Sequence, residues 1–137
     1  MASKRLGTIL VVDDHYNWCQ LLREILEYDG HQVATARCSE EARALLSASR
    51  FDVAVLDMRL VADVFDVGGM ILLQEIKNLY PSMKAIILTG FPDPDQRAKA
   101  IEFYGADGYY EKAPDGKPFD IDQFSDLINR LLKNQNL

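Results

Sequence analysis

Asp13 and Asp14 stand side by side at the point where an apolar run over residues 8–12 ends. Two carboxylates this close repel each other, and removing them from water makes the repulsion stronger. Such a pair occurs in solvated turns, and it also occurs in metal sites, where a cation offsets the negative charge. The residues that the fold brings to the same place decide between these two interpretations.

Three more residues with reactive or charged side chains follow expected short strands in the same way: Asp57 after residues 53–56, Thr89 after residues 85–88 and Lys112 after residues 108–111. Oxygen ligands alone suit a hard cation such as Mg²⁺, which takes one or two carboxylates together with water and phosphate oxygens. A hydroxyl and an ammonium group opposite the carboxylates would neutralise a bound phosphoryl group. Together with the acidic pair, these residues predict a pocket for Mg²⁺ and a phosphoryl group.

The elements that must position these residues are short strands alternating with helices. Strands are expected over residues 8–12, 31–36, 53–56, 85–88 and 108–111. Helices are expected over residues 18–29, from the N-cap Ser39, over residues 69–80, and from the N-caps Asp93 and Asp120. This alternation predicts an α/β fold in which helices cover both faces of a five-stranded parallel sheet. In such a sheet, ligands bind at the carboxyl ends of the strands.

The composition bounds the class of protein. A chain of 137 residues is expected to form a single domain over residues 1–137. Its net charge of −6 argues against direct nucleic-acid binding, because phosphate backbones attract basic surfaces. No apolar run approaches the ~20 residues that span a bilayer, and the N-terminus lacks the apolar core of a signal peptide. Cys19 and Cys38 have no metal-ligand spacing. These features predict a cytoplasmic protein without membrane contact.

The motifs ILVVDD, VAVLDMRL, AIILTG and GADGYYEK follow one another along the chain. In sequence, order and approximate spacing they resemble the receiver domain of two-component response regulators, with a core over residues 7–133. The resemblance implies a flavodoxin-like, doubly wound sheet with strand order 2-1-3-4-5. It also implies a phosphoacceptor signalling domain rather than an enzyme, with at most self-phosphorylation and autodephosphorylation. Its partners would be a sensor histidine kinase or phosphotransfer protein and an output partner or domain.

The resemblance assigns a role to each residue of the pocket. Asp57 would be the phosphoacceptor, attacking a phosphohistidine of the partner protein. Asp14 would bind Mg²⁺ directly and Asp13 would bind it through water. Asp57 and the backbone carbonyl of Arg59 would complete the protein ligands. The phosphoryl oxygens would be bound by two further side chains, those of Thr89 and Lys112.

The resemblance also implies a switch. Tyr109 matches the family's switch aromatic, which rotates when Thr89 moves. Phosphorylation is therefore expected to bury Tyr109 and to change the face formed by the fourth helix, the fifth strand and the fifth helix. The same face would serve a homodimer. The fourth helix has a thin expected apolar face, made of Ala98, Ile101 and Tyr104, and is expected to be the least firmly held.

Other functions fit these residues less well. An aspartate-nucleophile phosphohydrolase needs a second Asp two residues after the first, where this chain has His15 and Arg59. A flavodoxin holds a flavin phosphate after its first strand, where Asp14 would repel it. A GxGxxG dinucleotide motif is absent. The alternative that stays open is a receiver-like protein-interaction module that is not phosphorylated in its normal role.

Two features beside the pocket need their own interpretation. The chain between Asp57 and Gly69 is longer than the family pattern, and residues 60–68 are expected to form a flap. Apolar side chains in this stretch would gain from packing rather than from exposure to water. A lone histidine beside an acidic pair is more often a surface or supporting residue than a ligand, and this is the role expected of His15.

The choice of the pocket lysine lies between Lys112 and Lys117. The family usually has Lys-Pro at the end of the fifth strand, whereas this chain has Lys112-Ala113 there and KPF only at Lys117. Strand registry favours Lys112, because the sheet fixes where its side chain emerges. The Lys112–Ala113 bond is expected to be trans, because a cis bond before a non-proline residue costs about 2.5–4 kcal/mol.

Overall fold

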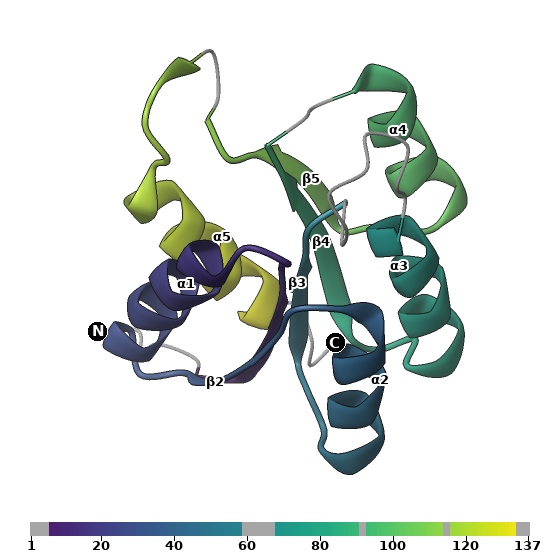
Figure 1. Cartoon of the computed structure of the whole chain (residues 1–137), viewed down its shortest axis with the longest axis horizontal. Helices are drawn as coiled ribbons and strands as arrows, with labels where there is room; N and C mark the ends of the chain where they lie inside the picture. The colour runs from purple at the N-terminus through teal and green to yellow at the C-terminus, as the bar shows by residue number, and fades with distance from the viewer. Residues whose placement is uncertain (1–5, 59–67, 91–92, 114–115, 134–137) are drawn as a thin grey trace.

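The computed structural model describes residues 6–58, 68–90, 93–113 and 116–133 (Figure 1). In chain order its elements are β1 (Thr8–Val12), α1 (Tyr16–Tyr28), β2 (Gln32–Ala36), α2 (Ser39–Ala48), β3 (Val53–Leu56), α3 (Gly68–Leu79), β4 (Lys84–Thr89), α4 (Pro94–Ala98), the π-helix η1 (Lys99–Phe103), β5 (Gly108–Glu111) and α5 (Ile121–Lys133). The expected flap lies outside the described residues, except for Gly68. None of the described helices combines the length and the apolar character that a membrane-spanning segment needs.

The described strands form a five-stranded sheet in the order β2-β1-β3-β4-β5, and every neighbouring pair is parallel. The register pairs Val12 with Leu56, Leu56 with Ile87 and Thr89 with Glu111. The carboxyl ends of β1, β3, β4 and β5 therefore meet at one edge. This arrangement confirms the predicted flavodoxin-like fold class.

Helices cover both faces of the sheet. Figure 1 shows α1 and α5 on one face and α2, α3 and α4 on the other. Alternate residues of β1 contribute to two apolar clusters. Ile9 and Val11 belong to the cluster with α1 and α5. Leu10 and Val12 belong to the cluster with α2 and α3. Burial on both faces explains why the β1 and β3 sequences are continuously apolar rather than alternating.

The helix N-termini follow the expected caps at two of three places. The side chain of Asp93 accepts a hydrogen bond from the Asp95 N–H at 2.9 Å. Asp120 Oδ1 likewise accepts from the backbone N–H three residues on, at 3.0 Å. The prediction that Ser39 caps α2 is wrong, because Ser39 is already the first residue of the helix. An acid of the first turn, Glu41, reaches back instead and accepts the Arg37 N–H at 2.8 Å.

The fourth helix differs from its expected form. After Ala98 it continues as the π-helix η1, in which the Tyr104 N–H donates to the Lys99 carbonyl five residues back. The wider turn changes which side chains face the sheet: Ala100 is buried and Tyr104 packs on the core. The expected face was wrong at two positions, since Ala98 and Ile101 are exposed.

Candidate functional site

The acidic residues meet at the carboxyl edge of the sheet. The Asp57 N–H donates to the Val12 carbonyl at 2.8 Å, and the Asp13 N–H donates to the Ala36 carbonyl at 3.0 Å. These bonds hold the residues that follow β1 and β3 on neighbouring strands, so their side chains converge. Ligand atoms of four residues lie within 4.8 Å of one another, those of Asp13, Asp14, His15 and Asp57. The structure thus brings together all three carboxylates singled out in the sequence.

Lys112 enters the same pocket from β5. Its backbone N–H donates to the Thr89 carbonyl at 2.8 Å, which fixes where its side chain leaves the sheet. Its Nζ lies 2.6 Å from Asp13 Oδ2 and 3.3 Å from Asp57 Oδ2. Lys117 is exposed. The structure therefore places Lys112 in the pocket, and the peptide bonds between described residues, Lys112–Ala113 included, are all trans.

Burial changes the acidity of Asp57. The side chain is only 5% exposed, and loss of solvation together with the charge of Asp13 raises its pKa from 3.8 to about 6. The ammonium of Lys112 acts in the opposite direction and lowers the pKa, but by less. A carboxylate in this pocket is therefore poorly compensated by the protein alone, and an added cation would stabilise its charged form.

A cation fits the donor atoms of the pocket. Asp14 Oδ1 is buried, yet it accepts no hydrogen bond from any residue that the structure describes. A buried carboxylate oxygen without a donor is unfavourable unless a cation binds it. The donors are mostly carboxylate oxygens, which suit a hard divalent ion such as Mg²⁺. Arg59, the residue expected to add a backbone carbonyl, lies outside the described residues.

Gly69 allows α3 to begin directly against the backbone of Asp57. A Cβ atom added at this glycine would lie 1.9 Å from the Asp57 carbonyl oxygen and 2.8 Å from Met58 Cα. Both contacts are with backbone atoms, so no change of rotamer could relieve them. The Gly69 N–H also donates to the Met58 carbonyl at 2.9 Å. The sequence showed a glycine that opens a helix, but it gave no sign of this close approach.

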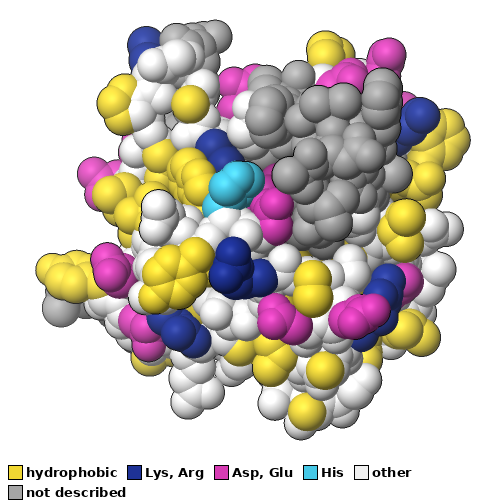
Figure 2. Space-filling model, in the orientation of Figure 1, with side chains coloured by type: hydrophobic (Ala, Val, Ile, Leu, Met, Phe, Trp, Pro, Cys, Tyr) yellow, Lys and Arg dark blue, Asp and Glu magenta, His cyan; other side chains and the backbone are white. Residues whose placement is uncertain are grey.

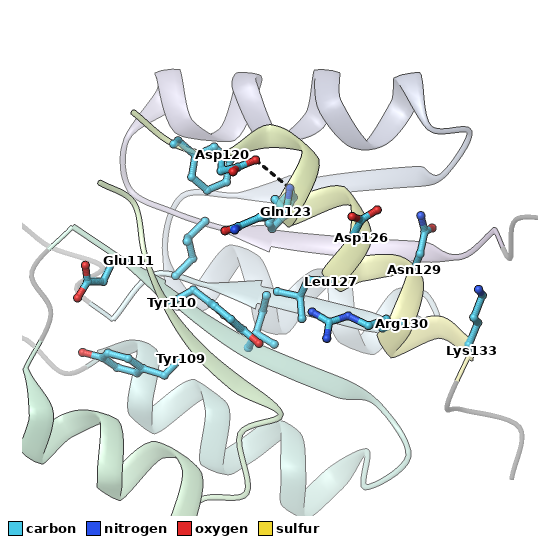
Figure 3. A pocket seen from close by; sticks show the side chains of 14 residues that line it. Tyr109, Tyr110, Glu111, Asp120, Gln123, Asp126, Leu127, Asn129, Arg130 and Lys133 are labelled. Carbon is cyan, nitrogen blue, oxygen red and sulfur yellow. Dashed lines mark hydrogen bonds between the residues drawn. The ribbon is translucent and has the colours of Figure 1, made fainter. Parts of the chain in front are cut away.

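Thr89 and Tyr109 lie beside the pocket on neighbouring strands. Thr89 ends β4 and is fully buried. Tyr109 is also buried in this structure, and its hydroxyl accepts the Asp93 N–H at 3.2 Å, which links β5 to the start of α4. Figure 3 shows Tyr109 and Tyr110 pointing to opposite sides of β5. Tyr110 is 38% exposed and faces the groove beside α5.

Trp18 makes a contact with the pocket that its helical spacing did not predict. It packs on the apolar cluster of α1 and α5, as expected for the core face of α1. Its ring also lies over Lys112, with Nζ 4.8 Å from the ring centroid. Phe119 meets the ring edge to face at a centroid distance of 5.3 Å. An aromatic side chain therefore covers the pocket lysine through a cation–π contact.

Fold and site together define a class of protein. It is a doubly wound α/β domain whose sheet edge holds three carboxylates, a buried lysine and a buried threonine. The response regulator receiver domain family matches residues 9–129, and the chain belongs to this family.

Comparisons with individual proteins agree with this assignment. The chain is 31% identical to the transcriptional regulatory protein ZraR of Salmonella typhimurium over 124 residues, which cover 90% of the chain and 26% of ZraR. It is 29% identical to the sporulation initiation phosphotransferase F of Bacillus subtilis, covering 90% of the chain and 92% of that protein. A CheY-like receiver domain protein from Methanospirillum hungatei superposes with a TM-score of 0.83 at 28% identity, covering 96% and 97% of the two chains. The chain therefore spans about a quarter of one relative and nearly all of another.

Membership of the family has direct chemical consequences. The chain is a signalling domain, and membership implies phosphorylation on an aspartate. Receiver domains bind Mg²⁺ at the acidic pocket, and this chain has an Asp cluster there that could hold a metal ion.

Proposed function

We propose that Asp57 accepts a phosphoryl group from the phosphohistidine of a sensor histidine kinase or phosphotransfer protein, in a Mg²⁺-dependent reaction within one receiver domain over residues 7–133. One observation carries the assignment: the Asp57 carboxylate is buried in a cluster with Asp13 and Asp14 while the Lys112 ammonium lies 3.3 Å from it. A nucleophile is thereby placed next to groups that can neutralise an incoming phosphoryl group.

The residues of the pocket divide the chemistry between them. A carboxylate oxygen of Asp57 forms the new P–O bond while the P–N bond of the phosphohistidine breaks and its imidazole takes up a proton. Mg²⁺, when bound, neutralises charge on the phosphoryl oxygens. Asp13, Asp14 and Asp57 would hold it, with Asp13 acting through water and the Arg59 carbonyl as a further ligand. Thr89 and Lys112 would bind the phosphoryl oxygens.

Intact mass spectrometry tests the assignment. After incubation with Mg²⁺ and acetyl phosphate, the chain should gain the mass of one phosphoryl group, and EDTA should prevent the gain. Asp57→Asn should not be labelled, whereas Asp126→Asn, at an exposed position of α5, should be labelled like the wild type. Full labelling of Asp57→Asn would overturn the assignment. If the wild type took up no phosphoryl group from acetyl phosphate or from a phosphorylated histidine kinase, the unphosphorylated interaction module would replace it.

A second experiment separates the two lysines. Lys112→Ala should remove the structural response to phosphorylation, because its ammonium contacts Asp57. Lys117→Ala should keep the response, because that side chain is exposed. Backbone chemical shifts of the phosphorylated variants measure the response. An unchanged response in Lys112→Ala, together with a lost response in Lys117→Ala, would reverse the assignment.

The face formed by α4, β5 and α5 is proposed as the output surface, through which phosphorylated chains would also pair. A groove of about 860 Å³ lies between β5 and α5, lined by Tyr110, Phe124 and Leu127 together with the cationic side chains of Arg130 and Lys133 (Figure 3). Its floor is apolar and its rim carries both signs of charge, since Glu111, Asp120 and Asp126 line it as well as Arg130 and Lys133, and such a surface suits a protein partner. Sedimentation velocity with and without beryllofluoride tests pairing. A monomer under both conditions would leave this face to an output partner alone.

A further inference from the structure

The His15 side chain contacts both carboxylates of the acidic pair. Its side chain is 60% exposed, and Nδ1 is 3.2 Å from Asp13 Oδ1 and 3.0 Å from Asp14 Oδ1. The His15 backbone N–H donates to Asp13 Oδ1 at 2.9 Å, which keeps the residue close to the pair. Figure 2 shows a histidine side chain against an acidic one on the surface of the molecule. The imidazole is therefore an exposed group that contacts both carboxylates.

A hydrogen bond satisfies only one of these two contacts. The contact between Nδ1 and Asp13 Oδ1 has hydrogen-bond geometry, whereas the contact between Nδ1 and Asp14 Oδ1 does not. Asp14 Oδ1 is buried and accepts no hydrogen bond within the described part of the chain, although Nδ1 is only 3.0 Å away. A cation bound directly by Asp14 Oδ1 and His15 Nδ1, and by Asp13 through water, would satisfy all three groups at once.

The spacing of the three atoms agrees with a shared ion. Neighbouring ligands of an octahedral ion with bonds of about 2.1 Å lie about 3.0 Å apart. His15 Nδ1 lies 3.0 Å from Oδ1 of Asp14, the direct ligand, and 3.2 Å from Oδ1 of Asp13, which would reach the ion through water. The Asp57 carboxylate belongs to the same group of ligand atoms within 4.8 Å. Three carboxylates and one imidazole form a mixed oxygen and nitrogen donor set.

We propose that His15 is a nitrogen ligand of this cation site, which thereby binds borderline transition-metal ions such as Ni²⁺ or Cu²⁺ as well as Mg²⁺. Imidazole is a good ligand for these ions, whereas Mg²⁺ prefers oxygen and would keep a water molecule in that position. The inference rests on the proposed metal site and adds one ligand to it. His15 was expected to be a surface or supporting residue, and the geometry assigns it a role in choosing the metal.

Calorimetric titration of the chain with Mg²⁺ and with Ni²⁺ tests this ligand. His15→Ala should weaken Ni²⁺ binding at least about tenfold and leave Mg²⁺ binding almost unchanged. Asn17→Ala, which changes an exposed residue in the same turn of α1, should affect neither ion. An unchanged ratio of the two affinities in His15→Ala would overturn the inference.

Pulsed EPR of the protein with one equivalent of Cu²⁺ gives a direct readout. The wild type should show modulation from the remote nitrogen of an imidazole ligand, and His15→Ala should lose it. The other histidine, His31, is buried and its Nδ1 accepts the Gly7 N–H. Retention of the modulation in His15→Ala would also overturn the inference. Asp14→Asn separates the two proposals: if it fails to weaken Mg²⁺ binding, the metal site itself is wrong, whereas weakened Mg²⁺ binding with no effect of His15→Ala rejects only the histidine.

Discussion

Helix α5 and the segment formed by α4 and η1 both border the edge strand β5, but the core holds them very differently. Helix α5 buries five apolar side chains, Phe124, Leu127, Ile128, Leu131 and Leu132. Helix α4 buries none, and η1 buries only Ala100. Because stabilisation scales with the apolar area removed from water, α5 is firmly anchored and the α4–η1 segment is not.

The weakly held α4–η1 segment is also the one that is connected to the pocket. Tyr109 links β5 to the start of α4 through the Asp93 N–H. Its strand, β5, pairs with β4, which ends at the pocket in Thr89. A conformational switch needs two arrangements of similar free energy, which a segment with little buried surface provides. The start of α5 is instead fixed by aromatic contacts, in which Phe119 packs against both Trp18 and Phe124.

The largest expected effect comes from matched truncations in the two segments. Ile128 in α5 is fully buried, and Ile101 in η1 is 36% exposed. Ile128→Ala should lower the free energy of unfolding by about 2–5 kcal/mol, because it removes core contacts and leaves a cavity. Ile101→Ala should lower it by less than about 1 kcal/mol. Urea unfolding followed by circular dichroism measures both. Equal losses would refute the contrast between the two segments.

A second prediction concerns the buried charge of Asp57. Folding raises the pKa of Asp57 from 3.8 to about 6, so the folded protein binds this proton more tightly than the unfolded chain. Stability should therefore rise as the pH falls from above 6 towards 4. In EDTA at pH 7.5, Asp57→Asn should be more stable than the wild type by about 3 kcal/mol, and the gain should vanish near pH 4.

A matched variant checks that the gain belongs to Asp57. Asp107 is also shielded from water, but it lies 2.7 Å from Lys77 Nζ and accepts the Ala85 N–H. Asp107→Asn should therefore lower the free energy of unfolding, because Lys77 would lose its partner. Both variants are measured by urea unfolding in EDTA. If both lowered stability by similar amounts, the uncompensated charge assigned to Asp57 would be wrong.

The sequence could predict the features that follow from strand burial and strand ends. Residues 9–12 of β1 and all of β3 are apolar because both faces of these strands are covered, so the strand ends, and with them Asp13 and Asp57, could be located. Counting along the fifth strand placed Lys112 at its end for the same reason, and in the structure the Lys112 N–H donates to the Thr89 carbonyl. Parallel strands in register fix side-chain positions at the sheet edge, and the site is built on these positions.

Other features depend on contacts between distant parts of the chain. The π-helical turn of η1 shifts the buried position to Ala100, and no local pattern marks that turn. The contact of Trp18 with Lys112 joins residues far apart in sequence. The close approach of α3 to Asp57 appears in the sequence only as Gly69. Each of these depends on how elements pack, which periodicity does not encode.

A third prediction concerns the conformational switch in the α4–η1 segment. Binding of beryllofluoride with Mg²⁺ should change amide hydrogen exchange in the α4–η1 segment by about tenfold, which corresponds to about 1.4 kcal/mol. Exchange in the second half of α5 should stay nearly constant, because its side chains are buried in the cluster with α1. Mass spectrometry of peptides from the two segments measures the difference. A change confined to α5 would show that the α4–η1 segment is not the element that switches.

The smallest expected effect comes from two equivalent helix caps. Asp93 caps α4 through the Asp95 N–H, and Asp120 caps α5 through the Gln123 N–H. Removing a cap weakens a helix by about 1 kcal/mol. Asp120→Ala should lower the free energy of global unfolding by about this amount, because α5 unfolds only with the whole domain.

Asp93→Ala should behave differently. Global stability cannot fall by more than the free energy needed to open α4 locally, because beyond that point the segment opens while the rest of the domain stays folded. We therefore expect a smaller global loss than for Asp120→Ala, together with faster amide exchange confined to α4. Urea unfolding and hydrogen exchange of both variants give the two readouts. Equal global losses, without faster exchange in α4, would show that α4 is held as firmly as α5 and would leave the switch without its mobile element.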